Sequence, residues 1–253
     1  MPNSFFWYDV MTTDTAAAKK FYADVVGWQP QDGGSPGYTA LTVGGVGVAG
    51  LMAIPEDAAK AGVPPCWMGY IHVDDVDACV VAIQKEGGRL MKGPVTIDGV
   101  ITFAVVADPQ GAGFLVAKPV PRAPKERPAR NAPGSVGWHE LYAHDWEKVW
   151  PFYEKLFGWT KVHTVDMGAM GIYQLFSTTG GEPAGGMMTK PPQVPVAYWN
   201  FYFVVPSVTG AAQKITEGGG QVLMAPTQVP GGGWILQARD PQGAVFALTS
   251  AQK

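Results

Sequence analysis

The stretch FYADVVGW at residues 21–28 is repeated as FYEKLFGW at residues 152–159, an offset of 152 − 21 = 131 residues. A strand-like run precedes each copy, FFWYDV in the first case and VGWHELY in the second. In the first copy Ala18, Phe21 and Tyr22 fall on one helical face, and Gly27 stands where a left-handed residue ends a helix. Because the same offset recurs elsewhere, we predict a tandem duplication.

The composition favours a folded protein that binds neither nucleic acid nor membranes. Of 253 residues, 47% are hydrophobic and 15% charged, and the net charge is −3, with no cluster of Lys and Arg on one face. Two cysteines, Cys66 and Cys79, cannot build a disulfide framework. The N-terminal segment lacks the pattern of a signal peptide, and no apolar run reaches the length of a membrane span. We therefore expect a soluble, cytoplasmic protein.

The pattern strand, helix, three strands occurs four times, in modules one to four at residues 5–54, 66–118, 135–189 and 197–249. Residues 119–134 are rich in Pro and Arg and are predicted to be a linker. An isolated module would leave a sheet edge uncovered. We therefore predict an α+β fold, in which four βαβββ modules pair into two lobes, residues 1–118 and 135–253. Curved mixed sheets would surround a cleft in each lobe, with the helices outside.

The repeated features resemble those of the glyoxalase, bleomycin-resistance and extradiol dioxygenase superfamily, the vicinal-oxygen-chelate fold. The resemblance rests on the first strand, the helix that ends in FYADVVGW or FYEKLFGW, the helix that ends in EGG, and the turn DPQG before a last strand. These features occur in this order in both halves and cover nearly everything except the linker. The chain looks most like two-lobed members of the superfamily, which implies a small-molecule site in the cleft.

The resemblance also implies a divalent metal, held by His and Glu on the first and last strands of paired modules. In this sequence the first-strand positions fall on Trp7 and Trp138, and near Met68 and Asn200. The carboxylate positions on the last strands fall near Leu115 and Ala247. Because these side chains do not form a set of converging metal ligands, we predict no metal cofactor. A divalent metal in an atypical ligand shell is the alternative.

Two acidic residues could still carry chemistry. Glu140 lies two residues after Trp138, and Asp9 lies two residues after Trp7, so each pair shares one face of a strand. His139 then points the opposite way. A buried carboxylate could act as a general base, which makes Glu140 and Asp9 the candidate catalytic residues. Each could equally be a polar group that bonds a neighbouring strand.

The candidate ligand-binding residues line the same predicted clefts: Trp7, Met68, Tyr70, Trp138, Asn200 and Tyr202. Indole rings at ligand positions would make the clefts apolar and suited to stacking on flat molecules, although the rings could also fill the cavity. The first hypothesis is a metal-free protein that binds a small apolar or aromatic molecule. The alternatives are a lyase, isomerase or oxygenase, and a scaffold with filled clefts that acts through protein interactions. Because each lobe can pair its own modules, a monomer is feasible, as is a homodimer.

Overall fold

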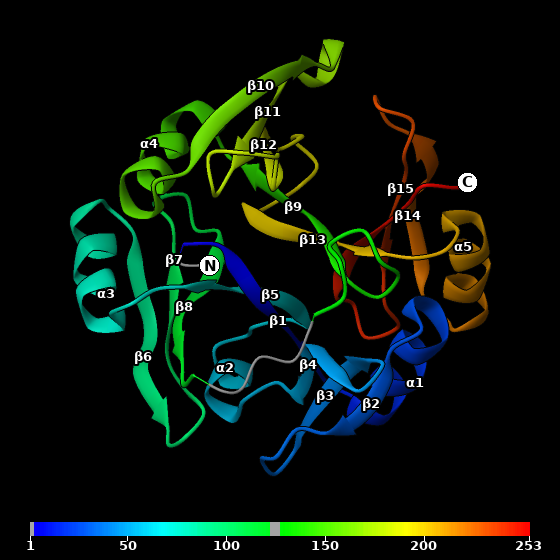
Figure 1. Cartoon of the computed structure of the whole chain (residues 1–253), viewed down its shortest axis with the longest axis horizontal. Coiled ribbons are helices and arrows are strands. Elements are labelled where there is room, and N and C mark those ends of the chain that lie inside the picture. The colour runs from blue at the N-terminus through cyan, green and yellow to red at the C-terminus, as the bar shows by residue number, and fades with distance from the viewer. Residues whose placement is uncertain (1–2, 122–126) are drawn as a thin grey trace. The chain divides into compact units, whose positions relative to one another are not determined.

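The computed structural model describes residues 3–121 and 127–253 (Figure 1). The predicted linker falls partly on residues 122–126, which lie outside the described residues. The helices are α1 (Thr15–Val26), α2 (Glu56–Lys60), α3 (Val76–Lys85), α4 (Trp146–Phe157) and α5 (Val208–Glu217), with a 3-10 turn at Gly168–Met170. None of the helices in the described ranges is long and apolar enough to cross a membrane.

The strands follow the predicted four-fold order. Those of the first two modules are β1 (Phe5–Thr12), β2 (Gln29–Asp32), β3 (Tyr38–Val43), β4 (Val46–Ala53), β5 (Cys66–His72), β6 (Arg89–Ile97), β7 (Ile101–Ala107) and β8 (Gly113–Pro119). Those of the last two are β9 (Val136–Ala143), β10 (Thr160–Asp166), β11 (Ile172–Ser177), β12 (Gly185–Thr189), β13 (Tyr198–Val204), β14 (Gln221–Gln228), β15 (Trp234–Arg239) and β16 (Val245–Ser250).

The sixteen strands of the described chain form two mixed sheets of eight. Their orders are β2-β3-β4-β1-β5-β8-β7-β6 and β10-β11-β12-β9-β13-β16-β15-β14. In each module the first strand runs parallel to the last, as β1 does to β4 and β5 to β8, and the other neighbours within a module are antiparallel. The prediction of an α+β fold built from four βαβββ modules is confirmed.

Contacts divide the chain into two compact units, each of which draws on both halves of the sequence. The outer-module unit holds modules one and four, and comprises Trp7–Trp67, Pro124–Gly137 and Asn200–Lys253. The inner-module unit holds modules two and three, and comprises Met1–Phe6, Met68–Ala123 and Trp138–Trp199. The predicted division into lobes at residues 1–118 and 135–253 stays a prediction.

Four of the helices begin at a capping side chain, and two of these end at a left-handed glycine. The side chain of Asp14 accepts hydrogen bonds from two backbone N–H groups at the start of α1, and Asp145 does the same for one at the start of α4. Asp75 and Ser207 cap α3 and α5. Gly27 and Gly158 end α1 and α4 with φ of 86° and 66°, a conformation that favours glycine.

A chain of buried hydrogen bonds joins modules one and four in the outer-module unit. Tyr22 of α1 donates its hydroxyl to Asp240 Oδ2 at 2.9 Å and accepts a hydrogen bond from Trp67 Nε1 at 2.8 Å. Asp240 opens the turn DPQG, and its Oδ1 accepts from three backbone N–H groups of that turn, those of Gln242, Gly243 and Ala244. The repeated FY pair therefore binds a turn more than 200 residues away, at a separation of 240 − 22 = 218.

The inner-module unit repeats this arrangement with modules two and three. Tyr153 of α4 donates to Asp108 Oδ2 at 3.0 Å and accepts from Trp199 Nε1 at 3.0 Å. Burial raises the pKa of the Asp108 and Asp240 carboxyl groups, although the hydrogen bonds that they accept partly offset this rise. Burial, and then the neighbouring aspartate, raises the pKa of Tyr22 and Tyr153, so both phenols keep their protons at neutral pH.

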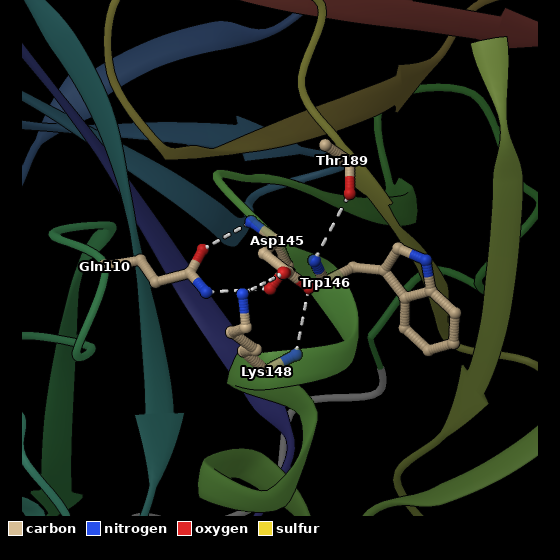
Figure 2. Close-up of polar contacts among 5 residues, drawn as sticks. All are labelled: Gln110, Asp145, Trp146, Lys148 and Thr189. Carbon is tan, nitrogen blue, oxygen red and sulfur yellow. Dashed lines mark hydrogen bonds and ion pairs between the residues drawn. The ribbon is translucent and has the colours of Figure 1, made fainter.

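A second contact fixes the start of α4 against the turn of module two (Figure 2). The Gln110 side chain donates to the Asp145 carbonyl at 2.7 Å and accepts from the Asp145 N–H at 2.9 Å. Asp145 also forms an ion pair with Lys148, whose Nζ lies 2.8 Å from Oδ2. Because α4 follows directly after β9, this contact helps to set the position of that strand, which carries two candidate site residues.

The repeated tryptophans Trp28 and Trp159 belong to the core. They are 1% and 0% exposed. Trp28 donates to the Gly134 carbonyl at 2.7 Å, and Trp159 donates to the Asn3 carbonyl at 2.7 Å and stacks on Phe176. Each indole N–H thus has a partner, which buried donors require. Cys66 and Cys79 are free, half-buried thiols.

The substitution Tyr153→Phe should lower the free energy of unfolding by about 1–3 kcal/mol, because it leaves Asp108 Oδ2 without its phenol donor and Trp199 Nε1 without its acceptor. Tyr22→Phe should act similarly in the outer-module unit. Urea unfolding measures both effects. A double-mutant cycle of Tyr153→Phe with Asp108→Asn should show a coupling energy. Purely additive effects would contradict the proposed linkage.

The raised carboxyl pKa values predict a pH dependence of stability. Asp108 and Asp240 bind protons more tightly in the folded state than in the unfolded state. Their contribution to the free energy of unfolding is therefore complete below the pKa of an unfolded aspartate, about 3.9, and it falls as the pH rises through their pKa in the folded protein. The double variant Asp108→Asn, Asp240→Asn should therefore lose less unfolding free energy than the wild type between about pH 4 and pH 7. Urea unfolding at several pH values tests this prediction. It would be refuted if the free energy of unfolding changed with pH equally in the wild type and in the double variant.

Candidate functional site

Three polar side chains meet on strands β1 and β3 of the outer-module unit. Trp7 Nε1 lies 2.9 Å from Asp9 Oδ1 and 2.8 Å from the Tyr38 hydroxyl, and Tyr38 donates to the same Asp9 oxygen at 2.7 Å. Asp9 is 5% exposed. We call these residues, Trp7, Asp9 and Tyr38, the outer cluster. Both the indole N–H and the phenol O–H are directed at one carboxylate, which fixes the plane of the Trp7 ring.

The outer cluster requires a glycine on the neighbouring strand. Gly50 of β4 lies opposite Asp9 in the parallel β1–β4 pair. A Cβ at Gly50 would lie 1.9 Å from the Tyr38 hydroxyl and 2.2 Å from Asp9 Oδ1. The side chains of Tyr38 and Asp9 therefore occupy the space that any larger residue at this position would need. A Cβ at Gly47 would lie 3.0 Å from the Trp7 ring. On the same ring, Arg127 Cζ lies 6.0 Å from the centroid.

The inner-module unit holds the equivalent inner cluster, Trp138, Glu140 and Tyr173. Trp138 Nε1 donates to the Tyr173 hydroxyl at 2.7 Å, and the Tyr173 hydroxyl is hydrogen-bonded to Glu140. Glu140 is 6% exposed and lies opposite Gly186 of β12 in the parallel strand pair. A Cβ at Gly186 would lie 2.2 Å from the Tyr173 ring. An indole, a carboxylate, a phenol and a glycine therefore recur in both units.

The phenols of both clusters keep their protons at neutral pH. Burial, and then the nearby Asp9 carboxylate, raises the pKa of Tyr38 well above its usual value. Burial and Glu140 raise the pKa of Tyr173 in the same way. Burial, followed by Glu140, also raises the pKa of Tyr198, whose ring stacks on that of Tyr142. These tyrosines therefore act as hydrogen-bond donors and not as phenolate bases.

His139 lies away from the inner cluster, as strand alternation predicts. Its ring stacks on Phe5 at a centroid distance of 4.7 Å, and its Nδ1 lies 2.8 Å from the Ala184 carbonyl oxygen. The side chain is 8% exposed. These contacts give His139 a packing role within the inner-module unit.

The remaining predicted ligand-binding residues lie on two strands. Met68 and Tyr70 are half-buried on β5 in the inner-module unit, where the Tyr70 ring lies 6.3 Å from Phe6. Asn200 and Tyr202 are 1% and 2% exposed on β13 in the outer-module unit. The structure thus joins Trp7 to Asp9 by a hydrogen bond and links Trp138 to Glu140 through the Tyr173 hydroxyl. The assignment of all eight predicted residues to a functional site remains a proposal.

Sequence reasoning missed Tyr38 and Tyr173, which complete the two clusters. Their offset is 173 − 38 = 135 residues, whereas Trp7 and Trp138 are separated by 138 − 7 = 131. Additional residues around β10 and the 3-10 turn shift the register, so a search at the fixed offset fails. The order of elements could have identified both tyrosines, because each lies at or next to the start of the second strand after the repeated helix.

Comparison with known proteins shows the family. The model of the Glyoxalase/Bleomycin resistance protein/Dioxygenase superfamily matches residues 4–116 and 135–248. The chain belongs to this superfamily. The two matches cover both halves of the sequence, as the tandem duplication requires.

Relatives and solved structures agree with this assignment. The chain is 34% identical over 248 residues to "Putative glyoxylase CFP32" of Mycobacterium tuberculosis, which covers 96% of this chain and 92% of that protein. It is 28% identical over 261 residues to the anthracycline biosynthesis protein DnrV of Streptomyces peucetius, with 98% and 93% covered. The Mn(II)-bound glyoxalase of Novosphingobium aromaticivorans has a TM-score of 0.70 at 18% identity, with 99% and 82% covered. The 2,3-dioxygenase LapB of Pseudomonas sp. KL28 has a TM-score of 0.64 at 13% identity, with 97% and 91% covered.

The side chains of the two clusters do not form a typical metal-binding set. Within residues 3–121 and 127–253, no group of three or more His, Cys, Asp or Glu side chains is placed to hold a metal ion. In each cluster an indole stands where the resemblance implies an imidazole, and the carboxylate is hydrogen-bonded to tyrosine. A divalent ion needs several converging oxygen, nitrogen or sulfur donors, and each cluster presents one carboxylate beside an indole and a phenol.

An open hollow of about 790 Å³ adjoins Tyr38 of the outer cluster, between the start of α1 and the β2–β3 hairpin. Its walls include Lys19, Asp32 and Tyr38, together with turn residues rich in Gly and Pro. Tyr38 is the one residue that this hollow shares with the outer cluster. The hollow offers exposed turn backbone and no converging set of buried polar groups, so the clusters remain the stronger candidates.

The steric fit at Gly50 and Gly186 gives a direct test of the clusters. Gly50→Ala and Gly186→Ala should each destabilise the protein by about 1–3 kcal/mol, because the added methyl group displaces Tyr38 or Tyr173. Gly181→Ala is the matched control, since its Cβ would meet only Thr179 Oγ1 at 3.8 Å. Thermal unfolding measures the three variants. Equal melting temperatures for all of them would show that the clusters are not tightly packed.

Proposed function

We propose that this superfamily member binds a small apolar or aromatic molecule beside its tryptophan clusters, without a metal. The fixed orientation of the Trp7 and Trp138 rings supports this proposal. Each indole donates its N–H to a tyrosine hydroxyl, at 2.8 Å and 2.7 Å. A ring whose plane is already set loses little conformational entropy when a flat ligand stacks on it.

The relatives support a planar ligand. Two of them are named anthracycline biosynthesis proteins, DnrV and DauV, and each shares 28% identity with this chain. Anthracyclines contain a fused ring system with aromatic rings, which is the shape that an oriented indole binds best. We infer that the ligand of this chain is also a fused, partly aromatic molecule, held by stacking and by a small number of hydrogen bonds.

The alternative is an enzyme in which Glu140 or Asp9 moves a proton. Glu140 is buried and lies near Tyr173 and Tyr198, an environment that suits a general acid or base. The names of the glyoxylase relatives favour this reading for the same site. In a Glu140→Gln variant, catalysis would stop while ligand binding persisted, and this separates the two functions. The chain itself we assign to the cytoplasm as a monomer or homodimer, without nucleic acid or membrane partners.

Tryptophan fluorescence tests the binding proposal. Titration with 1-hydroxyanthraquinone should quench the wild type saturably. Trp7→Ala or Trp138→Ala should weaken that binding by about tenfold, because the stacking surface is lost. Trp234→Ala is the matched control, since Trp234 lies outside both clusters on β15 and contacts Lys253. Unsaturable quenching, or equal affinities for all variants, would overturn the proposal.

A further inference from the structure

Asn200 is a buried carboxamide whose hydrogen-bonding atoms lack partners. The residue is 1% exposed, and within the described chain neither its Oδ1 nor its Nδ2 has a hydrogen-bond partner. A buried amide that bonds nothing costs stability, so most such groups in proteins bind a neighbour, a water molecule or a ligand. The carboxamide offers one acceptor and two donors, and therefore suits a partner that presents both kinds of group.

Strand alternation places Asn200 on the face of β13 opposite the aromatic core. Its neighbour Phe201 lies 5.2 Å from Tyr8, and Phe203 packs on Trp28 and Trp67 in the outer-module unit. Asn200 and Tyr202 therefore share the other face of the strand. Asn200 is thus separated from the packing that holds the helices to the sheet, and its polar atoms are not needed there.

Neutral side chains on three neighbouring strands, β13, β16 and β15, form a row on this face of the sheet. Tyr202 of β13 lies opposite Ala247 of β16, which lies opposite Gln237 of β15. Gln237 Nε2 donates to the Tyr202 hydroxyl at 3.1 Å, and so reaches across the small Ala247 side chain. Ala247 stands near the position where the family resemblance implies a metal-binding carboxylate. In its place the row offers an amide and a phenol with no formal charge.

The corresponding row of the inner-module unit keeps a phenol at Tyr70 but has Met68 and Val105 in place of the two amides. Each of its residues precedes its counterpart by 132 positions, as in 200 − 68 = 132 and 237 − 105 = 132. Tyr70 lies opposite Leu115, which lies opposite Val105, and Met68 takes the place of Asn200. The buried carboxamide is therefore present in one of the two duplicated rows, which predicts one polar recognition site per chain.

We propose that Asn200 binds a neutral ligand edge that carries a hydrogen-bond acceptor and a donor side by side, as in a carboxamide or a lactam. This inference rests on the proposed small-molecule function and specifies the chemistry of its ligand. The carboxamide of Asn200 pairs with such an edge through two antiparallel hydrogen bonds. An anionic ligand is disfavoured, because Asn200, Tyr202 and Gln237 carry no positive charge to offset its desolvation.

A matched pair of probes tests the proposal. 2-Naphthamide carries both an acceptor and a donor, whereas methyl 2-naphthoate has the same ring system and an acceptor only. The wild type should bind 2-naphthamide at least about tenfold more tightly, at one site per chain. Asn200→Leu and Asn200→Ala should abolish this preference. Gln228→Leu, which removes an exposed carboxamide on β14, is the control and should retain it. Isothermal titration calorimetry measures the affinities and the stoichiometry.

Stability provides a second readout. Asn200→Leu should raise the melting temperature of the ligand-free protein, because an apolar side chain replaces an unpartnered amide. A lower melting temperature together with unchanged probe affinities would overturn the inference and make Asn200 a structural group. Equal binding of both probes by the wild type would also overturn it, while leaving the proposed function intact. If neither probe nor 1-hydroxyanthraquinone binds, the proposed function itself fails.

Discussion

A buried tyrosine hydroxyl that donates to a buried aspartate organises each compact unit of this chain. Tyr22 bonds Asp240, and Tyr153 bonds Asp108, at 2.9 Å and 3.0 Å. Each bond joins the helix of one module to the turn of another, and each aspartate also holds its turn by accepting backbone N–H groups. Because all four residues are buried, an unmade bond would leave polar groups without water or partner. This requirement explains why the FY pair and the DPQG turn recur together in the sequence.

The candidate site residues Trp7, Asp9, Trp138 and Glu140 lie on one face of strands β1 and β9. In a metal-binding relative this face would need imidazoles and carboxylates that are available to an ion. Here the indoles of Trp7 and Trp138 stand where the family resemblance implies metal ligands. Tyrosine hydroxyls are hydrogen-bonded to the carboxylates of Asp9 and Glu140. The glycines Gly50 and Gly186 make room for these tyrosines. Both halves of the duplicated chain therefore present the same set of groups on this strand face.

Much of the fold follows from local sequence patterns. The repeat, the helical face with Ala18, Phe21 and Tyr22, and the helix end at Gly27 each depend on short-range spacing, and the structure agrees with all of them. The pairing of Tyr22 with Asp240 could not be predicted in this way. The turn at Asp108 has the same sequence, and local patterns do not specify which module packs against which.

The site was predictable only in part for a similar reason. Strand alternation places Trp138 and Glu140 on one face and His139 on the other, and this follows from three consecutive residues. Tyr173 comes from a different strand, in a segment whose length differs between the halves, so its contact with Glu140 depends on tertiary register. The unpartnered state of Asn200 is likewise a property of the packed chain, since any Asn has the same bonding capacity in the sequence.

Trp7, Trp138 and Asn200 stand at or near positions where the family resemblance implies metal ligands. Elemental analysis by mass spectrometry therefore tests whether the protein binds its ligand without a metal. It is applied to protein purified without an affinity tag and dialysed against buffer that contains no chelator. We expect Mn, Fe, Ni and Zn contents far below one ion per chain, together with unchanged binding of 1-hydroxyanthraquinone after EDTA treatment. A stoichiometric ion that EDTA removes together with ligand binding would instead make the site a metal centre.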